Sequence, residues 1–148
     1  MKVYIAADHN GFELRKSIVS YLRKHGYDIV ETGETEFDPN DDYPIIAQRL
    51  TRELLASKDK DPRGILICGS GQGVCIAANR SKGARALLGY DNESVRSARN
   101  DDDANILCLP ARTLSTNKAI SLVNTFLDTE FAAAPRFIRR KHELDNIG

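Results

Sequence analysis

The sequence predicts an α/β fold in which helices cover both faces of a parallel sheet. Short apolar runs alternate along the chain with longer segments of helical periodicity, and several of these runs are apolar at every position. Strands of that kind are typical of a parallel sheet buried on both faces. The order βαβαβαβαβα favours a five-stranded parallel sheet within a Rossmann-like three-layer sandwich.

The strands and helices can be placed in chain order. The expected strands are residues 3–7, 27–30, 65–68, 84–89 and 106–109. Apolar residues at helical spacing predict a first helix before Gly26 and a second after Pro44, because glycine commonly ends a helix and proline is accepted in its first turn. Further helices are expected from about Gly73, over residues 92–100 and over residues 116–127.

Length and composition are those of one globular domain. The 148 residues are enough to bury about 70% of the unfolded surface, and no linker or repeat divides residues 1–148. The 21 basic and 21 acidic side chains cancel, so neither nucleic acid nor a membrane is expected as a partner. The first sixteen residues lack a signal-peptide pattern and the cysteine count is odd, so we expect a cytoplasmic protein with reduced thiols. A cation-rich tail, 135–148, follows the last expected helix.

The segment "LICGSGQGVCIAANR" places three glycines where a strand ends and a helix begins. Gly69, Gly71 and Gly73 permit positive φ angles and a close approach to a ligand. The segment lacks the Lys-Ser/Thr pair of a phosphate-binding NTPase loop and the G-x-G-x-x-G spacing of a dinucleotide site. Three possibilities remain open: a small phosphorylated ligand, an oxyanion formed in a reaction, or a tight turn with no ligand.

Cys68 ends the apolar run just before these glycines. The positive end of a helix dipole favours a thiolate, which can act as a base or a nucleophile. Alternatively, Cys68 is a small buried apolar residue, and this is the interpretation favoured for Cys75 and Cys108. Without its sequence context, Cys68 would also be assigned the buried apolar role.

Several motifs together resemble the ribose-5-phosphate isomerase B family, which is related to the galactose-6-phosphate isomerase subunits. They are "AADHNGFELRKSIVSYL", "DDYP", "GILICGSGQGVCIAANR", "NILCLPAR" and "PRFIRRK", in the family's order and over nearly the whole chain. The resemblance implies an enzyme of carbohydrate metabolism and the pentose phosphate pathway. It would interconvert ribose 5-phosphate and ribulose 5-phosphate through a cis-enediolate with a cysteine base, needing no metal or other cofactor.

The resemblance also implies roles for individual residues. Cys68 matches the base, and Ser70 matches a nearby hydroxyl; members without the cysteine use a glutamate where this chain has Val74. The turn amides would receive the enediolate oxygens. The matched residues of the sugar and phosphate sites are Asp8, His9, Tyr43, Gly69, Gly71, Gly73, Arg112, Arg136 and Arg140. Taken singly, these residues also suit helix capping, core packing or a solvated surface.

The chain departs from the family pattern in "RNDDDANIL". Asp101 stands where members usually carry a ring-opening histidine, and Asp102 where they carry a substrate-binding asparagine. Asp101 could replace the histidine if burial beside Asp8 or Asp102 raised its pKa, or the substrate could be a tetrose phosphate that forms no comparable ring. A third alternative is that these acidic residues form a solvated helix end. Phe137 also replaces a frequent histidine.

The resemblance implies a homodimer with shared active sites, possibly paired into a tetramer, in which the tail contributes to the phosphate site or the dimer interface. Two other functions stay open. One is an isomerase of a tetrose 4-phosphate or hexose 6-phosphate. The other is a sugar-phosphate-binding homologue without catalytic activity.

Overall fold

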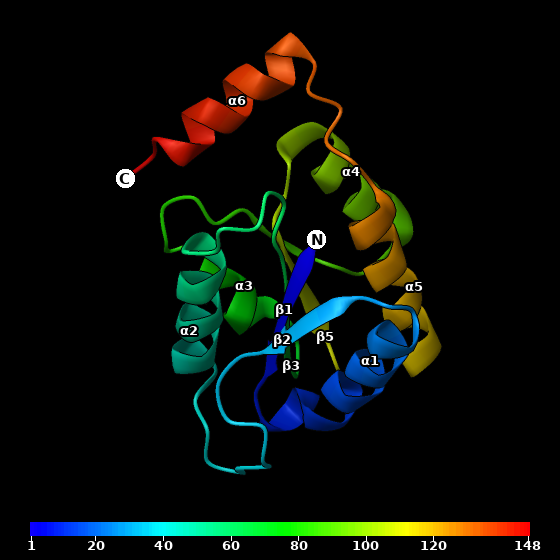
Figure 1. Ribbon diagram of the computed structural model, residues 1–148. Coiled ribbons are helices and arrows are strands. Elements are labelled where there is room, and N and C mark those ends of the chain that lie inside the picture. Colours follow the sequence, from blue (N-terminus) through cyan, green and yellow to red (C-terminus); the bar gives the residue numbers. More distant parts are fainter.

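The computed structural model describes residues 1–148 and contains one five-stranded parallel sheet (Figure 1). The strands are β1 (Lys2–Ala7), β2 (Asp28–Glu31), β3 (Arg63–Cys68), β4 (Ala86–Leu88) and β5 (Ile106–Pro110). Their order across the sheet is β2-β1-β3-β5-β4. The predicted fold class is therefore confirmed, and all five expected strands are present.

Six α-helices and one 3-10 turn, η1 (His9–Gly11), complete the chain. The helices are α1 (Phe12–Lys24), α2 (Tyr43–Leu55), α3 (Gln72–Ala78), α4 (Asn92–Asp102), α5 (Thr116–Asp128) and α6 (Pro135–Asp145). Helices α1, α4 and α5 cover one face of the sheet, and α2 and α3 cover the other (Figure 1). This arrangement is the predicted three-layer sandwich.

The core consists of two apolar clusters, one on each side of the sheet. Every residue of β3 is buried, and its side chains alternate between the clusters, with Ile65 and Ile67 in one and Leu66 and Cys68 in the other. Burying one such aliphatic side chain contributes about 1.5–3 kcal/mol. The central strand that carries Cys68 is thus held by packing on both faces.

Local signals explain where the helices begin and end. The Asp91 carboxylate accepts a hydrogen bond from the Ser94 N–H at 2.7 Å, and the Ser115 hydroxyl accepts one from the Lys118 N–H at 3.1 Å. These contacts satisfy otherwise free amides at the starts of α4 and α5. Gly26 takes a φ of 81° shortly after α1, as expected for a glycine that ends a helix.

Two expectations need correction. The tail was expected to follow the last helix, but residues Pro135–Asp145 form a sixth helix, because Pro135 suits a first helical turn and the following residues favour helix. The strand expected over 84–89 is limited to Ala86–Leu88 and is only half-buried, since β4 is an edge strand. None of the helices combines the length and the apolar character needed to cross a membrane.

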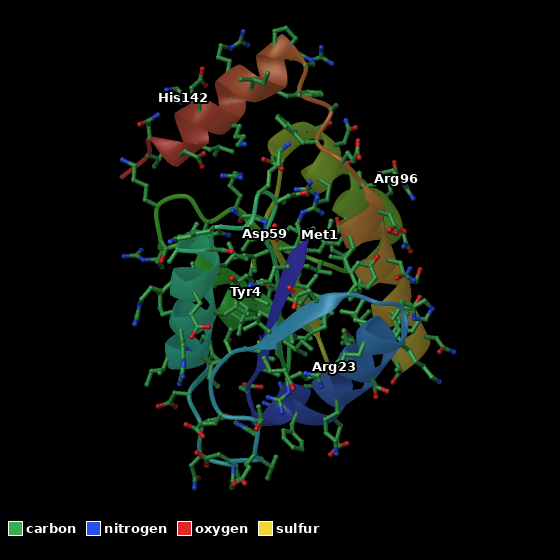
Figure 2. The ribbon with its side chains drawn as sticks, viewed as in Figure 1. Met1, Tyr4, Arg23, Asp59, Arg96 and His142 are labelled. Carbon is green, nitrogen blue, oxygen red and sulfur yellow. The ribbon has the colours of Figure 1, made fainter.

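Helix α6 stands apart from the sandwich, at the end of the sheet where the strands begin (Figure 1). We call this end the amino edge and the opposite end the carboxyl edge. Figure 2 labels Met1 and Asp59 at the amino edge, where the terminal ammonium and the Asp59 carboxylate are 3.8 Å apart. His142 of α6 lies beyond them in the same view.

Candidate active site

The turn between β3 and α3 lies at the carboxyl edge, where parallel α/β sheets bind ligands. Cys68, the last residue of β3, is only 5% exposed. Gly71 has a left-handed backbone with a φ of 73°, and its N–H donates a hydrogen bond to the Cys68 Sγ at 3.2 Å. The amide dipole of Gly71 therefore points at the Cys68 sulfur.

The start of α3 presents further main-chain donors. The Gln72 N–H donates to the Ser70 hydroxyl at 3.3 Å, whereas the amides of Gly73 and Val74 meet no acceptor within the protein. Free amides beside a thiol are suited to stabilise an oxyanion that develops there. The turn therefore places a thiol beside main-chain N–H donors.

Two glycines of this turn leave room for neighbouring functional side chains. A Cβ at position 69 would lie 2.8 Å from the Arg112 Cζ, and one at position 73 would lie 2.7 Å from the Tyr43 Cζ. Both distances are too short for real contacts, so glycine is required for Arg112 and Tyr43 to approach the turn. The Arg112 N–H also donates to the Gly69 carbonyl at 3.0 Å. Arg112 is exposed, and no carboxylate forms an ion pair with it.

Asp8 extends from the end of the neighbouring strand β1. Its N–H donates to the Ile67 carbonyl at 3.1 Å, which holds it beside the strand that carries Cys68. Its carboxylate accepts hydrogen bonds from the N–H groups of Asn10 and Gly11 at 2.9 and 3.3 Å. Burial raises the pKa of Asp8, although these hydrogen bonds oppose the shift. A carboxyl group with a raised pKa is suited to proton transfer.

His9 is held by Asp41, a residue that the sequence analysis quoted within "DDYP" but did not single out. The Asp41 Oδ1 lies 2.7 Å from the His9 Nδ1 and accepts a hydrogen bond from the His9 N–H at 3.0 Å. The hydrogen bond that His9 donates to Asp41 raises the pKa of His9, and the charge of Asp8 acts in the same direction. His9 and Asp41 are 32 residues apart in the sequence, so no local pattern could have identified Asp41 as the partner of His9.

The same three side chains form the one group whose donor atoms are placed for a metal ion. The ligand atoms of Asp8, His9 and Asp41 all lie within 4.8 Å of one another. The carboxylate of Asp8 already accepts two amide hydrogen bonds, and His9 and Asp41 bond to each other.

The other two cysteines, Cys75 and Cys108, do not contact the main-chain N–H groups of the glycine turn. Cys108 is fully buried in the sheet, and burial raises the pKa of its thiol well above the usual value. Cys75 is half-buried, with its Sγ 3.6 Å from the Ala86 carbonyl oxygen. These positions agree with the packing role predicted for Cys75 and Cys108.

Four predicted site residues do not join this cluster within one chain. Asp101 and Asp102 end α4, and Arg136 and Arg140 lie on α6, all at the amino edge. A strand of five or six residues is about 17–20 Å long, so one chain cannot bring them to Cys68. Asp101 is consequently not beside Asp8 in the chain, and its carboxylate instead accepts a hydrogen bond from the Asn100 side chain at 2.8 Å.

A cavity of about 300 Å³ opens at the carboxyl edge, between the loop after β2 and the start of α2. His9 and Asp41 line it, but Cys68 does not. This cavity therefore does not reach Cys68. The carboxyl edge holds the Cys68 thiol, free main-chain N–H groups and the unpaired Arg112, but it lacks the remaining predicted phosphate ligands.

Comparison with known proteins matches residues 3–144 to a family described as Ribose/Galactose Isomerase. The chain is 42% identical over 129 residues to a probable ribose-5-phosphate isomerase B of Mycoplasma pneumoniae, which spans 87% of this chain and 84% of that one. It is 35% identical over 140 residues to a ribose-5-phosphate isomerase B of Mycolicibacterium paratuberculosis, covering 95% of this chain and 87% of that one.

Solved structures agree with this match. The structure of ribose-5-phosphate isomerase B from Mycoplasma genitalium with bound ribulose-5-phosphate superposes with a TM-score of 0.91 at 38% identity, over 97% of this chain and 93% of that one. The enzyme of Thermotoga maritima gives the same TM-score and identity, over 99% and 98% of the two chains.

Proposed function

The chain belongs to the ribose/galactose isomerase family, and from this premise we propose that it interconverts ribose 5-phosphate and ribulose 5-phosphate. Relatives that are 42% and 35% identical to the chain are named as isomerases of this type. The observation that carries the proposal is the Cys68 thiol, which accepts a hydrogen bond from the Gly71 amide at the mouth of the glycine turn. Neither Cys75 nor Cys108 accepts a hydrogen bond from the main-chain amides of this turn.

In the proposed reaction, the Cys68 thiolate removes the proton from C2 of the open-chain aldose. The electron pair forms a cis-enediolate, whose oxygens are stabilised by the free amides of Gly73 and Val74 and by the Ser70 hydroxyl. The thiol then returns the proton to C1, and one hydroxyl proton moves from O2 to O1, giving the ketose and regenerating the thiolate. These steps need proton transfer and oxyanion stabilisation but no metal.

Ring opening and substrate binding are assigned to the polar groups around the thiol. Asp8 has a raised pKa and can exchange a proton with the ring oxygen or a hydroxyl group. His9, whose pKa is raised by its hydrogen bond to Asp41, is suited to bind a phosphate together with Arg112. Tyr43 lies against the turn and would line the sugar site.

A second copy of the chain would complete the site. Arg136 and Arg140 are exposed at the amino edge and have no acidic partner, so in a homodimer they could bind the phosphate held at the other subunit's carboxyl edge. Residues near the end of the chain leave apolar surface for such an interface: Ile138, Leu144 and Ile147 are 51%, 44% and 70% exposed. We therefore retain the homodimer with shared sites, with a tetramer as a further possibility.

Solvent deuterium incorporation tests the reaction. Four-, five- and six-carbon aldose phosphates are incubated with the protein in D₂O, and exchange at C2 together with ketose formation is followed by NMR. The proposal expects ribose 5-phosphate to react fastest. Faster reaction of a tetrose or hexose phosphate would show that ribose 5-phosphate is not the preferred substrate. Measurable binding without exchange would favour a non-catalytic sugar-phosphate-binding homologue.

Asp101 stands where family members usually carry a ring-opening histidine, and this difference favours a substrate that needs no ring opening, such as a tetrose phosphate. If the missing histidine limits opening of the furanose ring, Asp101→His will raise turnover of cyclic pentose phosphates and leave a tetrose phosphate unaffected. An unchanged or lower rate with ribose 5-phosphate, in a correctly folded variant, would show that ring opening does not depend on this position.

A further inference from the structure

Helix α6 is attached to the rest of the molecule by charge rather than by a buried apolar face. None of its residues is buried, and it packs mainly against the end of α4. Phe137, Lys141 and Asp145 are its half-buried positions, and they follow one another at intervals of four. Residues at this spacing share one side of a helix, so this stripe is the side that faces the sandwich.

Two ion pairs connect this stripe to the sandwich. The Lys141 Nζ lies 2.6 Å from the Asp103 Oδ2, and the Arg85 Nη1 lies 2.7 Å from the Asp145 Oδ1. Arg85 and Asp103 are themselves joined, because the Arg85 Nε donates to the Asp103 carbonyl at 3.0 Å and its Nη2 lies 3.4 Å from the Asp103 Oδ2. We refer to Arg85, Asp103, Lys141 and Asp145 as the clasp.

The sandwich side of the clasp is rigidly built. Asp103 has a left-handed backbone with a φ of 51°, directly after α4. Its Oδ1 accepts a hydrogen bond at 2.9 Å from Arg99, which is itself 1% exposed. Burial opposes ionisation of Asp103, but hydrogen bonds from Lys141 and Arg99 outweigh it and hold the pKa of Asp103 below its usual value. The clasp therefore stays charged at neutral pH.

Arg136 and Arg140 lie on another side of the same helix. Each directly precedes a residue of the half-buried stripe and is turned from it by about 100° around the helix axis. Both are exposed, and the Arg136 guanidinium lies over the Phe137 ring at 4.4 Å. Fixing the stripe against the sandwich thus also fixes the direction in which the two arginines point.

We propose that the clasp is a positioning device for phosphate binding: it sets the angle of α6 so that Arg136 and Arg140 of one subunit meet the phosphate at the carboxyl edge of another. This inference rests on the proposed function. Clasp residues act through the two arginines and do not touch the substrate. Their loss should consequently weaken substrate binding while leaving the proton transfer at Cys68 intact.

The test compares substitutions on two sides of α6. Asp145→Asn and Lys141→Met each remove one ion pair of the clasp, and we expect each to raise the KM for ribose 5-phosphate about fivefold, with kcat changed less than about twofold. Asp145→Glu keeps the charge and should retain the KM of the original chain. Glu143→Gln is the matched control, because it removes only the exposed Arg139–Glu143 pair on the same helix.

The outcomes separate this inference from the proposed function. A double Arg136→Met, Arg140→Met variant measures the phosphate contact itself. If that variant raises KM but Asp145→Asn and Lys141→Met do not, the positioning role is overturned and the proposed function stands. If the original chain does not isomerise ribose 5-phosphate, the proposed function is wrong, and the positioning role, which rests on it, is overturned with it.

Oligomer mass and melting temperature are measured for each variant, because the clasp could instead serve assembly or stability. The expected result is an unchanged mass and a KM that rises with added salt more steeply in the original chain than in Asp145→Asn. A rise in KM that appears only together with loss of the dimer would assign the four residues to assembly and overturn the positioning role.

Discussion

The carboxyl edge and the amino edge hold their functional groups in different ways. At the carboxyl edge, main-chain geometry fixes Cys68, through a fully buried strand and a left-handed glycine. At the amino edge, ion pairs between side chains fix α6, and no residue of that helix is buried. The proposed chemistry thus lies on the rigid part of the molecule, whereas the proposed phosphate contacts depend on charge.

This difference has measurable consequences. Packing and main-chain hydrogen bonds respond little to salt, whereas ion pairs at partly exposed side chains are screened. Changes at the carboxyl edge should therefore affect kcat most, and changes at the amino edge should affect KM and its dependence on salt. The predictions below test this division, from the largest expected effect to the smallest.

Replacing the proposed base should have the largest effect. We expect Cys68→Ala to lower kcat by about 10²–10⁴-fold, the usual contribution of a positioned base, with little change in KM. The control is Cys75→Ala, which removes a thiol from the same segment without touching the Gly71 amide. Steady-state kinetics with ribose 5-phosphate measures both variants. A kcat for Cys68→Ala within tenfold of the original would show that another group is the base.

Mixing two impaired variants, with ribose 5-phosphate kept well below the KM of the arginine double variant, tests whether the two edges meet between subunits. Cys68→Ala is combined in equal amounts, by co-expression, with the Arg136→Met, Arg140→Met double variant. In a twofold-symmetric dimer, half of the mixed population is heterodimeric and each heterodimer has one intact site, so about a quarter of the original activity should return. Activity no higher than the average of the two parents would contradict shared sites.

Filling the space at Gly69 should have a moderate effect. A Cβ there would displace the Arg112 guanidinium, and we expect Gly69→Ala to raise the KM for ribose 5-phosphate about tenfold. Arg112→Met should cause a similar rise, and the double variant should be no worse than the single ones, because both changes remove the same contact. Additive effects in this cycle would mean that Gly69 acts independently of Arg112.

The smallest effect is expected at the His9–Asp41 pair. The pKa of His9 is raised in the folded chain above the unfolded value of about 6.5, so the pair stabilises the fold fully below that pH. Its contribution is lost as the pH rises through the folded-state pKa of His9. Asp41→Asn should lower the His9 pKa measured by NMR titration and reduce the excess stability at pH 6 relative to pH 8 in urea unfolding. An unchanged His9 titration would exclude Asp41 as the cause.

The sequence was sufficient for the sheet and for helices α1 to α5, because each of these elements carries a local signal. Apolar runs with no polar alternation identified β1, β3 and β5, and glycine and proline marked where helices end and begin. Helix α6 was missed because it has no apolar stripe to bury, and a charged segment of that composition also suits an irregular tail. The Asp41 contact was missed because it joins residues 32 positions apart.

By itself, the sequence determined the layered fold, the glycine turn after Cys68 and the resemblance that led to the isomerase family, because each depends on residues close together in the chain. Only the tertiary structure decided that the proposed site is divided between two edges of the sheet. The reason is geometric: strands run in one direction, so residues that follow a strand and residues that precede one are separated by its full length. No short sequence motif shows that these two groups of residues lie a full strand length apart.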